Sequence, residues 1–225
     1  MRSGLLTSEN WIDGLPQIVR AEIIARASVT RLKAGEEFSA AGQTPKGVFQ
    51  VVEGYLRLIG LQEDGRLNLI TIYSAGNAFA ETAVVARRPL NHSTQAITPT
   101  TVRCLAQADF WALYEAHREI PDALCRKFAG AIGRQLATRQ LGTSRRLGKR
   151  VAMIFEELAH RVGRAQPDGR VVIGLPITQQ DLADHLGVTR QSIQREIKEL
   201  KALRLIGRDH RQWHVVDRAG LRRLS

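Results

Sequence analysis

The sequence predicts an α+β protein with a β-rich N-terminal part, a long helix, and a C-terminal part in which two short helices precede a β-hairpin. Three observations predict this order. Residues 29–105 hold short β-type runs separated by glycines. Residues 121–141 repeat apolar side chains at three- and four-residue intervals. Residues 178–197 have the pattern of two helices joined by a tight turn, and strand-like sequence follows at 204–216.

The N-terminal part begins with an expected helix over residues 8–27. Its apolar side chains are Trp11, Ile12, Leu15, Ile18, Val19, Ile23 and Ile24. The clearest strands that follow are 48–52, 55–59, 67–72 and 101–105. Asp64-Gly65, between two of these strands, is a strong hairpin signal. Closely spaced short strands of this kind predict a small barrel or sandwich.

The helix over 121–141 carries a narrow apolar stripe. Pro121 suits its first turn. The stripe consists of Leu124, Phe128, Ala131 or Ile132, and Gln135 or Leu136. A stripe of this width fits an intramolecular packing face and a dimer seam equally well, so its periodicity leaves both open.

The C-terminal part starts at Thr143-Ser144, which ends the long helix and can cap the next one, expected to run to about residue 162. A turn at 166–169 and a strand at 171–175 follow. The later segment 204–216 has strand-like ends around a polar tip, which predicts a β-hairpin. A β-hairpin after a helix-turn-helix is called a wing.

The two short helices have clear boundaries. Thr178 can cap the first helix, with Asp181 in the reciprocal acidic position. Gly187 stands where the turn needs a positive φ, and Thr189 can cap the second helix. The expected apolar face consists of Leu182, Leu186, Ile193 and Ile197. This pattern predicts a helix-turn-helix whose second helix, residues 190–203, has the base-reading position of a DNA-binding protein.

The charge of the chain agrees with a polyanionic partner. The net charge is +11 and the isoelectric point is near 10.6. From residue 144 onward 17 Lys/Arg stand against 9 Asp/Glu, a net +8, whereas residues 1–143 carry 16 against 13, a net +3. The positive charge is therefore concentrated in the part that holds the helix-turn-helix.

Several classes of protein are disfavoured. No apolar run approaches the roughly 20 residues that a membrane span needs, and the N-terminus lacks a signal-peptide core, so we expect a cytoplasmic protein without membrane contact. Cys104 and Cys125 cannot form a disulfide framework or a four-thiolate cluster. We find no phosphate loop, nucleophile motif or metal constellation, so we do not expect an enzyme.

Taken in order, these elements resemble the Crp/Fnr superfamily of bacterial transcription regulators, to which the cyclic-AMP receptor protein belongs. The resemblance covers the chain from about Leu15 onward. Its most specific part is 177–195, ITQQDLADHLGVTRQSIQR, and 147–158 is similar to the helix that opens the family's DNA-binding domain. The segments 35–38, 51–56 and 76–81 match the family's nucleotide-binding β-roll more loosely.

The resemblance implies a division of labour along the chain. It predicts a jelly-roll β-roll of the cyclic-nucleotide-binding type over 1–120, a central dimerisation helix over 121–143, and a winged-helix DNA-binding domain over 144–225. The resemblance thus favours a dimer seam over an intramolecular packing face for the apolar stripe of the central helix. The expected partners are double-stranded DNA and a second copy of the chain, with RNA polymerase added if the protein is an activator.

The DNA contacts can be assigned by side-chain chemistry. Arg190 and Arg195 project about 140° apart on the helix, so they cannot read the same base; each is expected to face a guanine or a flanking phosphate. Gln191, where the family often has glutamate, can pair with adenine. The phosphate candidates are Thr189, Ser192, Thr178, Gln179, Arg208, His210 and Arg211.

The effector site departs from the family pattern. The cyclic-nucleotide cassette implied by the resemblance needs a glycine-glutamate pair and, about ten residues on, an arginine-serine pair. Here Glu81 follows Ala80, and the arginine-serine position falls on Leu90-Asn91 or Asn91-His92, without a fixed cation. The candidate pocket residues are Glu81, Arg87, Arg88, Asn91 and Gln135.

We therefore do not expect a cyclic nucleotide, and expect another small molecule or no effector. Haem on the lone His92 is not expected either, and the absence of N-terminal cysteines excludes the family's iron-sulfur cluster. The leading function is a homodimeric transcription regulator that reads a pseudo-palindromic operator. The alternative is a ligand-binding or protein-interaction module whose winged helix is only a scaffold; a steep salt dependence of binding to random duplex would favour the regulator.

Overall fold

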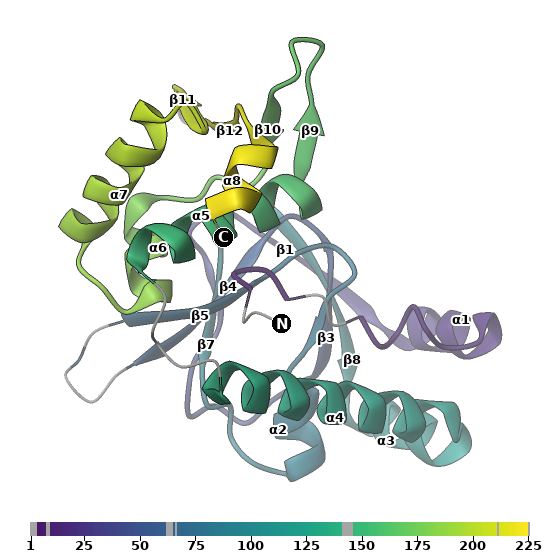
Figure 1. Cartoon of the computed structure of the whole chain (residues 1–225). Coiled ribbons are helices and arrows are strands. Elements are labelled where there is room, and N and C mark those ends of the chain that lie inside the picture. The colour runs from purple at the N-terminus through teal and green to yellow at the C-terminus, as the bar shows by residue number, and fades with distance from the viewer. Residues whose placement is uncertain are drawn as a thin grey trace. The chain divides into compact units, whose positions relative to one another are not determined.

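The computed structural model describes residues 4–7, 10–61, 65, 67–140, 146–210 and 212–224, without the side chains of 134, 135 and 137–140. The chain divides into two compact units, Met1–Gln140 and Leu141–Ser225. Figure 1 traces the helices and strands of both. Among the described residues, no helix is long and apolar enough to cross a membrane.

The first unit is a β-roll of two four-stranded antiparallel sheets, as predicted. One sheet has the order β1-β8-β3-β6 and the other β2-β7-β4-β5. The strands are β1 (Ser28–Leu32), β2 (Glu37–Ser39), β3 (Gly47–Glu53), β4 (Leu56–Leu61), β5 (Leu67–Tyr73), β6 (Ala78–Phe79), β7 (Ser93–Ala96) and β8 (Thr100–Ala106). β4 and β5 form the predicted hairpin; Asp64 of its expected turn lies outside the described residues.

Four helices accompany the roll: α1 (Gln17–Arg26), α2 (Glu81–Ala86), α3 (Gln107–Ala116) and α4 (Glu119–Gln140). Apolar side chains from α1, α3 and the start of α4 pack against β3 and β8 in one cluster, which includes Trp11, Val19, Phe110, Leu113 and Leu124. Inside the roll, Phe38, Phe49, Tyr73 and Phe79 form a second cluster of contacting rings. These two cores fix α2 and α4 relative to the roll.

The expected helix over 8–27 was wrong at its beginning. Trp11 and Ile12 are buried, yet they lie in turns before α1, which begins at Gln17 directly after Pro16. A proline in the first turn is compatible with a helix start but not with its interior. Ile18 and Ile24, expected in the apolar face, are 70% and 50% exposed.

The second unit is a helix-turn-helix with a four-stranded sheet of order β11-β12-β10-β9. Its elements are α5 (Leu147–Arg161), β9 (Gly163–Ala165), β10 (Val171–Ile173), α6 (Gln179–Leu186), α7 (Arg190–Ala202), β11 (Ile206–Asp209), β12 (Gln212–Val215) and α8 (Arg218–Leu224). The predicted wing is the antiparallel hairpin of β11 and β12. α5 starts at Leu147 with Arg146 at its N-cap and no side-chain cap; Thr143 and Ser144 lie outside the described residues.

The core of this unit is centred on Trp213 of β12, which is fully buried. Its ring meets that of Phe155 of α5 edge to face, with centroids 5.3 Å apart. Its indole N–H donates to the Ile177 carbonyl at 2.9 Å, just before α6. Trp213 therefore joins the wing, α5 and the start of the helix-turn-helix.

Candidate DNA-binding interface

The two helices of the helix-turn-helix are capped as predicted. The Thr178 hydroxyl accepts a hydrogen bond from the Asp181 amide at 3.1 Å, and Asp181 Oδ2 accepts one from the Thr178 amide at 2.8 Å. Gly187 ends α6 at φ +66°, the left-handed conformation that favours glycine. The Thr189 hydroxyl accepts from the Ser192 amide at 3.2 Å and begins α7. Local sequence chemistry thus fixes where α7 starts.

The packing of the two helices leaves one face of α7 exposed. Leu182 and Ala183 of α6 and Ile193 and Ile197 of α7 are buried, whereas Leu186 is only half-buried. Arg150 of α5 donates from Nη2 to the Leu186 carbonyl at 3.0 Å and holds the end of α6. The buried side of α7 therefore faces α5 and α6, and its N-terminal turns present their other side to solvent.

The three predicted base-reading residues, Arg190, Gln191 and Arg195, are all exposed on α7. Arg195 is 67% exposed and its Nη2 donates to Glu196 Oε1 at 3.1 Å. Glu196 was not among the sequence candidates. Its position beside Ile193, Leu200 and Ile197 on the helical wheel, at the margin of the buried face, is the signal that could have indicated it.

The predicted phosphate contacts fall into two groups. The Thr178 and Thr189 side chains are exposed, while those of Gln179 and Ser192 are half-buried. The Thr189 and Ser192 hydroxyls also lie 2.9 Å from each other. Each of these residues stands at or next to the N-terminus of α6 or α7, where backbone N–H groups and the helix dipole favour an anion.

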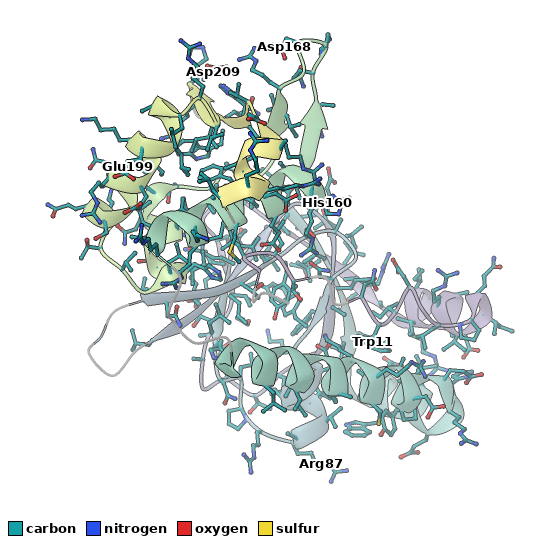
Figure 2. All side chains as sticks on the ribbon, viewed as in Figure 1. Trp11, Arg87, His160, Asp168, Glu199 and Asp209 are labelled. Atoms are coloured by element: carbon teal, nitrogen blue, oxygen red, sulfur yellow. The ribbon has the colours of Figure 1, made fainter. Side chains whose placement is uncertain are left out.

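On the wing, Arg208 and His210 are exposed, and Arg211 lies outside the described residues. The guanidinium of Arg208 stands 4.9 Å from the centre of the Trp213 ring, and Lys201 Nζ of α7 stands 5.4 Å from it. Both cations are thus held near the same aromatic side chain. Next to Arg208 on β11, Asp209 pairs with Arg170 at 3.1 Å, and Arg170 also pairs with Asp168 at 2.6 Å. Figure 2 labels these two carboxylates.

The candidate effector residues differ in burial. Glu81 is buried, whereas Arg87, Arg88 and Asn91 are exposed, and the side chain of Gln135 lies outside the described residues. The Arg87 guanidinium, labelled in Figure 2, stands 5.5 Å from the ring centre of Trp111 on α3.

The buried Glu81 carboxylate makes an ion pair with Lys127 of α4, a residue that sequence reasoning missed. Lys127 Nζ also donates to the Ala78 carbonyl at 3.0 Å. Burial and the Glu81 charge together raise the pKa of Tyr73, whose ring stacks on Phe79. Among the described residues, no group of three or more His, Cys, Asp or Glu side chains is arranged to hold a metal ion.

Two family models match the chain. Residues 29–117 match a cyclic nucleotide-binding domain, and residues 149–224 match a Crp-like helix-turn-helix domain. The first covers the roll and α3, and the second covers nearly all of α5 through α8.

Curated relatives span nearly the same length. The nitrogen fixation regulation protein FixK of Rhizobium meliloti (strain 1021) is 29% identical over 224 residues, covering 93% of this chain and 95% of that protein. The HTH-type transcriptional regulator Cmr of Mycobacterium tuberculosis (strain CDC 1551 / Oshkosh) is 24% identical over 213 residues, covering 93% and 82%.

Solved structures have the same fold. FixK2 from Bradyrhizobium japonicum superposes with a TM-score of 0.74 at 23% identity, covering 88% of this chain and 97% of that one. A CooA variant from Carboxydothermus hydrogenoformans gives 0.73 at 17% identity and covers 98% of both chains. The two family models together match most of the chain, and with the relatives above they show that it belongs to the Crp/Fnr family of DNA-binding transcription regulators.

Proposed function

We propose that the protein acts as a homodimer that reads a pseudo-palindromic operator with two copies of α7. The observation that carries the proposal is the exposure of Arg190, Gln191 and Arg195 at the start of a capped, well-packed helix. A helix N-terminus that enters the major groove brings such side chains to the base edges. The arginine forks suit guanine O6 and N7, and the Gln191 amide suits adenine N6 and N7.

Phosphate contacts would set the register of α7 in the groove. We assign them to Thr189, Ser192, Thr178 and Gln179 at the two helix N-termini, and to Arg208 and Arg211 on the wing. These contacts carry little sequence information, so their loss should weaken specific and random binding alike.

The dimer would form through α4. Ile132 and Leu136 lie four residues apart on this helix and are 58% and 56% exposed. An apolar pair at this spacing is covered when two such helices pack along each other. A two-fold axis would place the two copies of α7 about one turn of DNA apart, roughly 34 Å.

A cyclic nucleotide is not the effector that we propose. The Glu81 carboxylate, which the family resemblance assigns to the ribose, is already paired with Lys127. A nucleotide would have to break this buried pair before its ribose could bind Glu81. Its phosphate would then need a cation, and the nearby Arg87 and Arg88 are exposed at the surface. Another small molecule, or no effector, fits better, and neither haem nor an iron-sulfur cluster is invoked.

The protein would act in the cytoplasm without catalysing a reaction, and would contact RNA polymerase if it activates transcription.

Selection from random duplex DNA tests the base-reading assignment. We expect the wild-type protein to enrich a two-fold symmetric site. Arg190→Ala should then cost on the order of 1–3 kcal/mol on that site and relax one base preference in each half. Equal losses on the selected site and on random duplex would show instead that Arg190 contacts only phosphate.

A further inference from the structure

Glu196 is an unusual neighbour for a base-reading arginine, because its side chain is only 11% exposed while that of Arg195 is 67% exposed. It stands on α7 between the exposed face and the side that carries the buried Ile193 and Ile197. A carboxylate buried to this degree needs charged or polar partners.

The two carboxylate oxygens of Glu196 face different elements. Oε1 accepts the hydrogen bond from Arg195 Nη2 at 3.1 Å. Oε2 lies against Gly148 in the first turn of α5, so closely that a Cβ placed on Gly148 would be 2.8 Å from it. One carboxylate therefore lies in contact with both the arginine and the beginning of a different helix.

The first turn of α5 is a favourable place for this charge. The N-cap residue, Arg146, makes no side-chain cap hydrogen bond. The first backbone N–H groups of a helix lack intrahelical partners, and the helix dipole is positive there. An approaching carboxylate complements this end, and glycine at 148 leaves the room that the carboxylate occupies.

We propose that Glu196 is a positioning residue for Arg195 and sets the base preference at the position that Arg195 reads. The inference rests on the proposed function of α7. The Glu196 carboxylate lies against α5 and accepts a hydrogen bond from one edge of the Arg195 guanidinium. The remaining N–H donors of the fork stay available for a base edge. Free arginine side chains sample many rotamers. Fixing the Arg195 guanidinium before DNA binds therefore reduces the conformational entropy that is lost on binding.

This role predicts that Arg190 and Arg195 contribute to DNA binding in different ways. Arg195 is partly neutralised by Glu196, so it should contribute less than its full charge to the attraction of random DNA. Its contribution to sequence preference should depend on the Glu196 carboxylate, whereas that of Arg190 should not.

The test compares the base preferences of the full-length protein, four single variants and one double variant, Arg195→Ala/Glu196→Gln, on the selected operator and its single-base substitutions. Glu196→Gln removes the charge, and Gly148→Ala displaces the carboxylate without changing α7. Arg195→Ala removes the reading side chain. Glu199, labelled in Figure 2, is an exposed residue of α7. Glu199→Gln also removes one negative charge from α7 and serves as the matched control.

We expect Glu196→Gln and Gly148→Ala to reduce the preference at the Arg195 position by roughly three- to tenfold. The preference at the Arg190 position should stay unchanged. Both Glu→Gln variants should bind random duplex slightly more tightly, because each removes one negative charge. On the Arg195→Ala background, Glu196→Gln should have no further effect on base preference.

Two results would overturn the inference. One is an unchanged preference in both Glu196→Gln and Gly148→Ala. The other is an effect of Glu196→Gln that is as large on the Arg195→Ala background as in the wild type. A wild-type protein that selects no sequence at all would contradict the proposed function instead, so the two failures are distinguishable.

Discussion

The two units handle charge in opposite ways. On α7, Arg190 is exposed at the start of a helix whose own cap needs no charged side chain, and Arg195 stays largely exposed although it pairs with Glu196. In the β-roll, Glu81 is buried and its charge is answered by Lys127 from the same unit. Exposed cations can still attract an external polyanion. A buried carboxylate that is paired within the fold has no charge left unpaired for a ligand. The second unit therefore presents charged side chains to an external ligand. In the first unit, the carboxylate of Glu81 is already paired with Lys127.

The largest expected effect comes from breaking the internal pair. Lys127→Met leaves Glu81 buried without its partner and should lower the free energy of unfolding by about 3–5 kcal/mol. Urea denaturation followed by circular dichroism measures this loss.

The double variant Lys127→Met/Glu81→Leu is the control, because it removes both charges and should recover more than half of the loss. A single variant as stable as the wild type would mean that the pair contributes little and that Glu81 is accessible to other partners.

A smaller effect is expected from the cap of the reading helix. Thr189→Ala removes the acceptor for the Ser192 amide and should destabilise the second unit by about 1 kcal/mol. The loss can be followed by the fluorescence of Trp213 in a protein that carries phenylalanine at Trp11 and Trp111. Thr189→Ser, which keeps the hydroxyl, should behave like the wild type; an equal loss in both variants would point to the methyl group instead of the cap.

The smallest effect concerns the pH dependence of the second unit. Glu156 of α5 accepts hydrogen bonds from Arg218 at 3.2 Å and Arg222 at 3.0 Å, both on α8. Burial favours a raised pKa for Glu156, but the hydrogen bonds and charges of the two arginines outweigh it and hold the pKa below its ordinary value of about 4.5.

Because the folded pKa is depressed, the stabilisation from Glu156 is complete above about pH 4.5 and is lost as the pH falls through the folded value. Glu156→Gln should therefore cost roughly 1 kcal/mol or less at pH 7, and the difference from the wild type should shrink below pH 4. Denaturation curves at pH 7 and pH 3.5 check this; a difference that grows on acidification would contradict the assignment.

The parts of the fold that the sequence predicts best are those governed by neighbouring residues. The capping pair of Thr178 and Asp181 and the positive φ of Gly187 act over three or four positions, so a single sequence displays them. α3 was not predicted, because Phe110, Trp111 and Tyr114 crowd its middle without the regular alternation of apolar and polar faces.

The parts of the site that the sequence did not predict depend on distant or borderline positions. Lys127 meets Glu81 from 46 residues away, and only the folded roll brings them together. Glu196 follows Arg195 directly, but its contact with Gly148 depends on how α7 packs on α5. Residue type indicated the reading helix; tertiary packing decides which side chains support it.

The affinity of the nucleotide-free protein for its selected operator should be measured with and without saturating cyclic AMP at fixed salt, because this tests most directly whether the Glu81–Lys127 pair replaces a nucleotide. We predict binding at least about 10³-fold tighter than to random duplex, with or without the nucleotide, once any metabolite that the selection shows to be required is present. Operator binding that rises tenfold or more on addition of cyclic AMP would contradict the claim that the roll's glutamate is already occupied by Lys127.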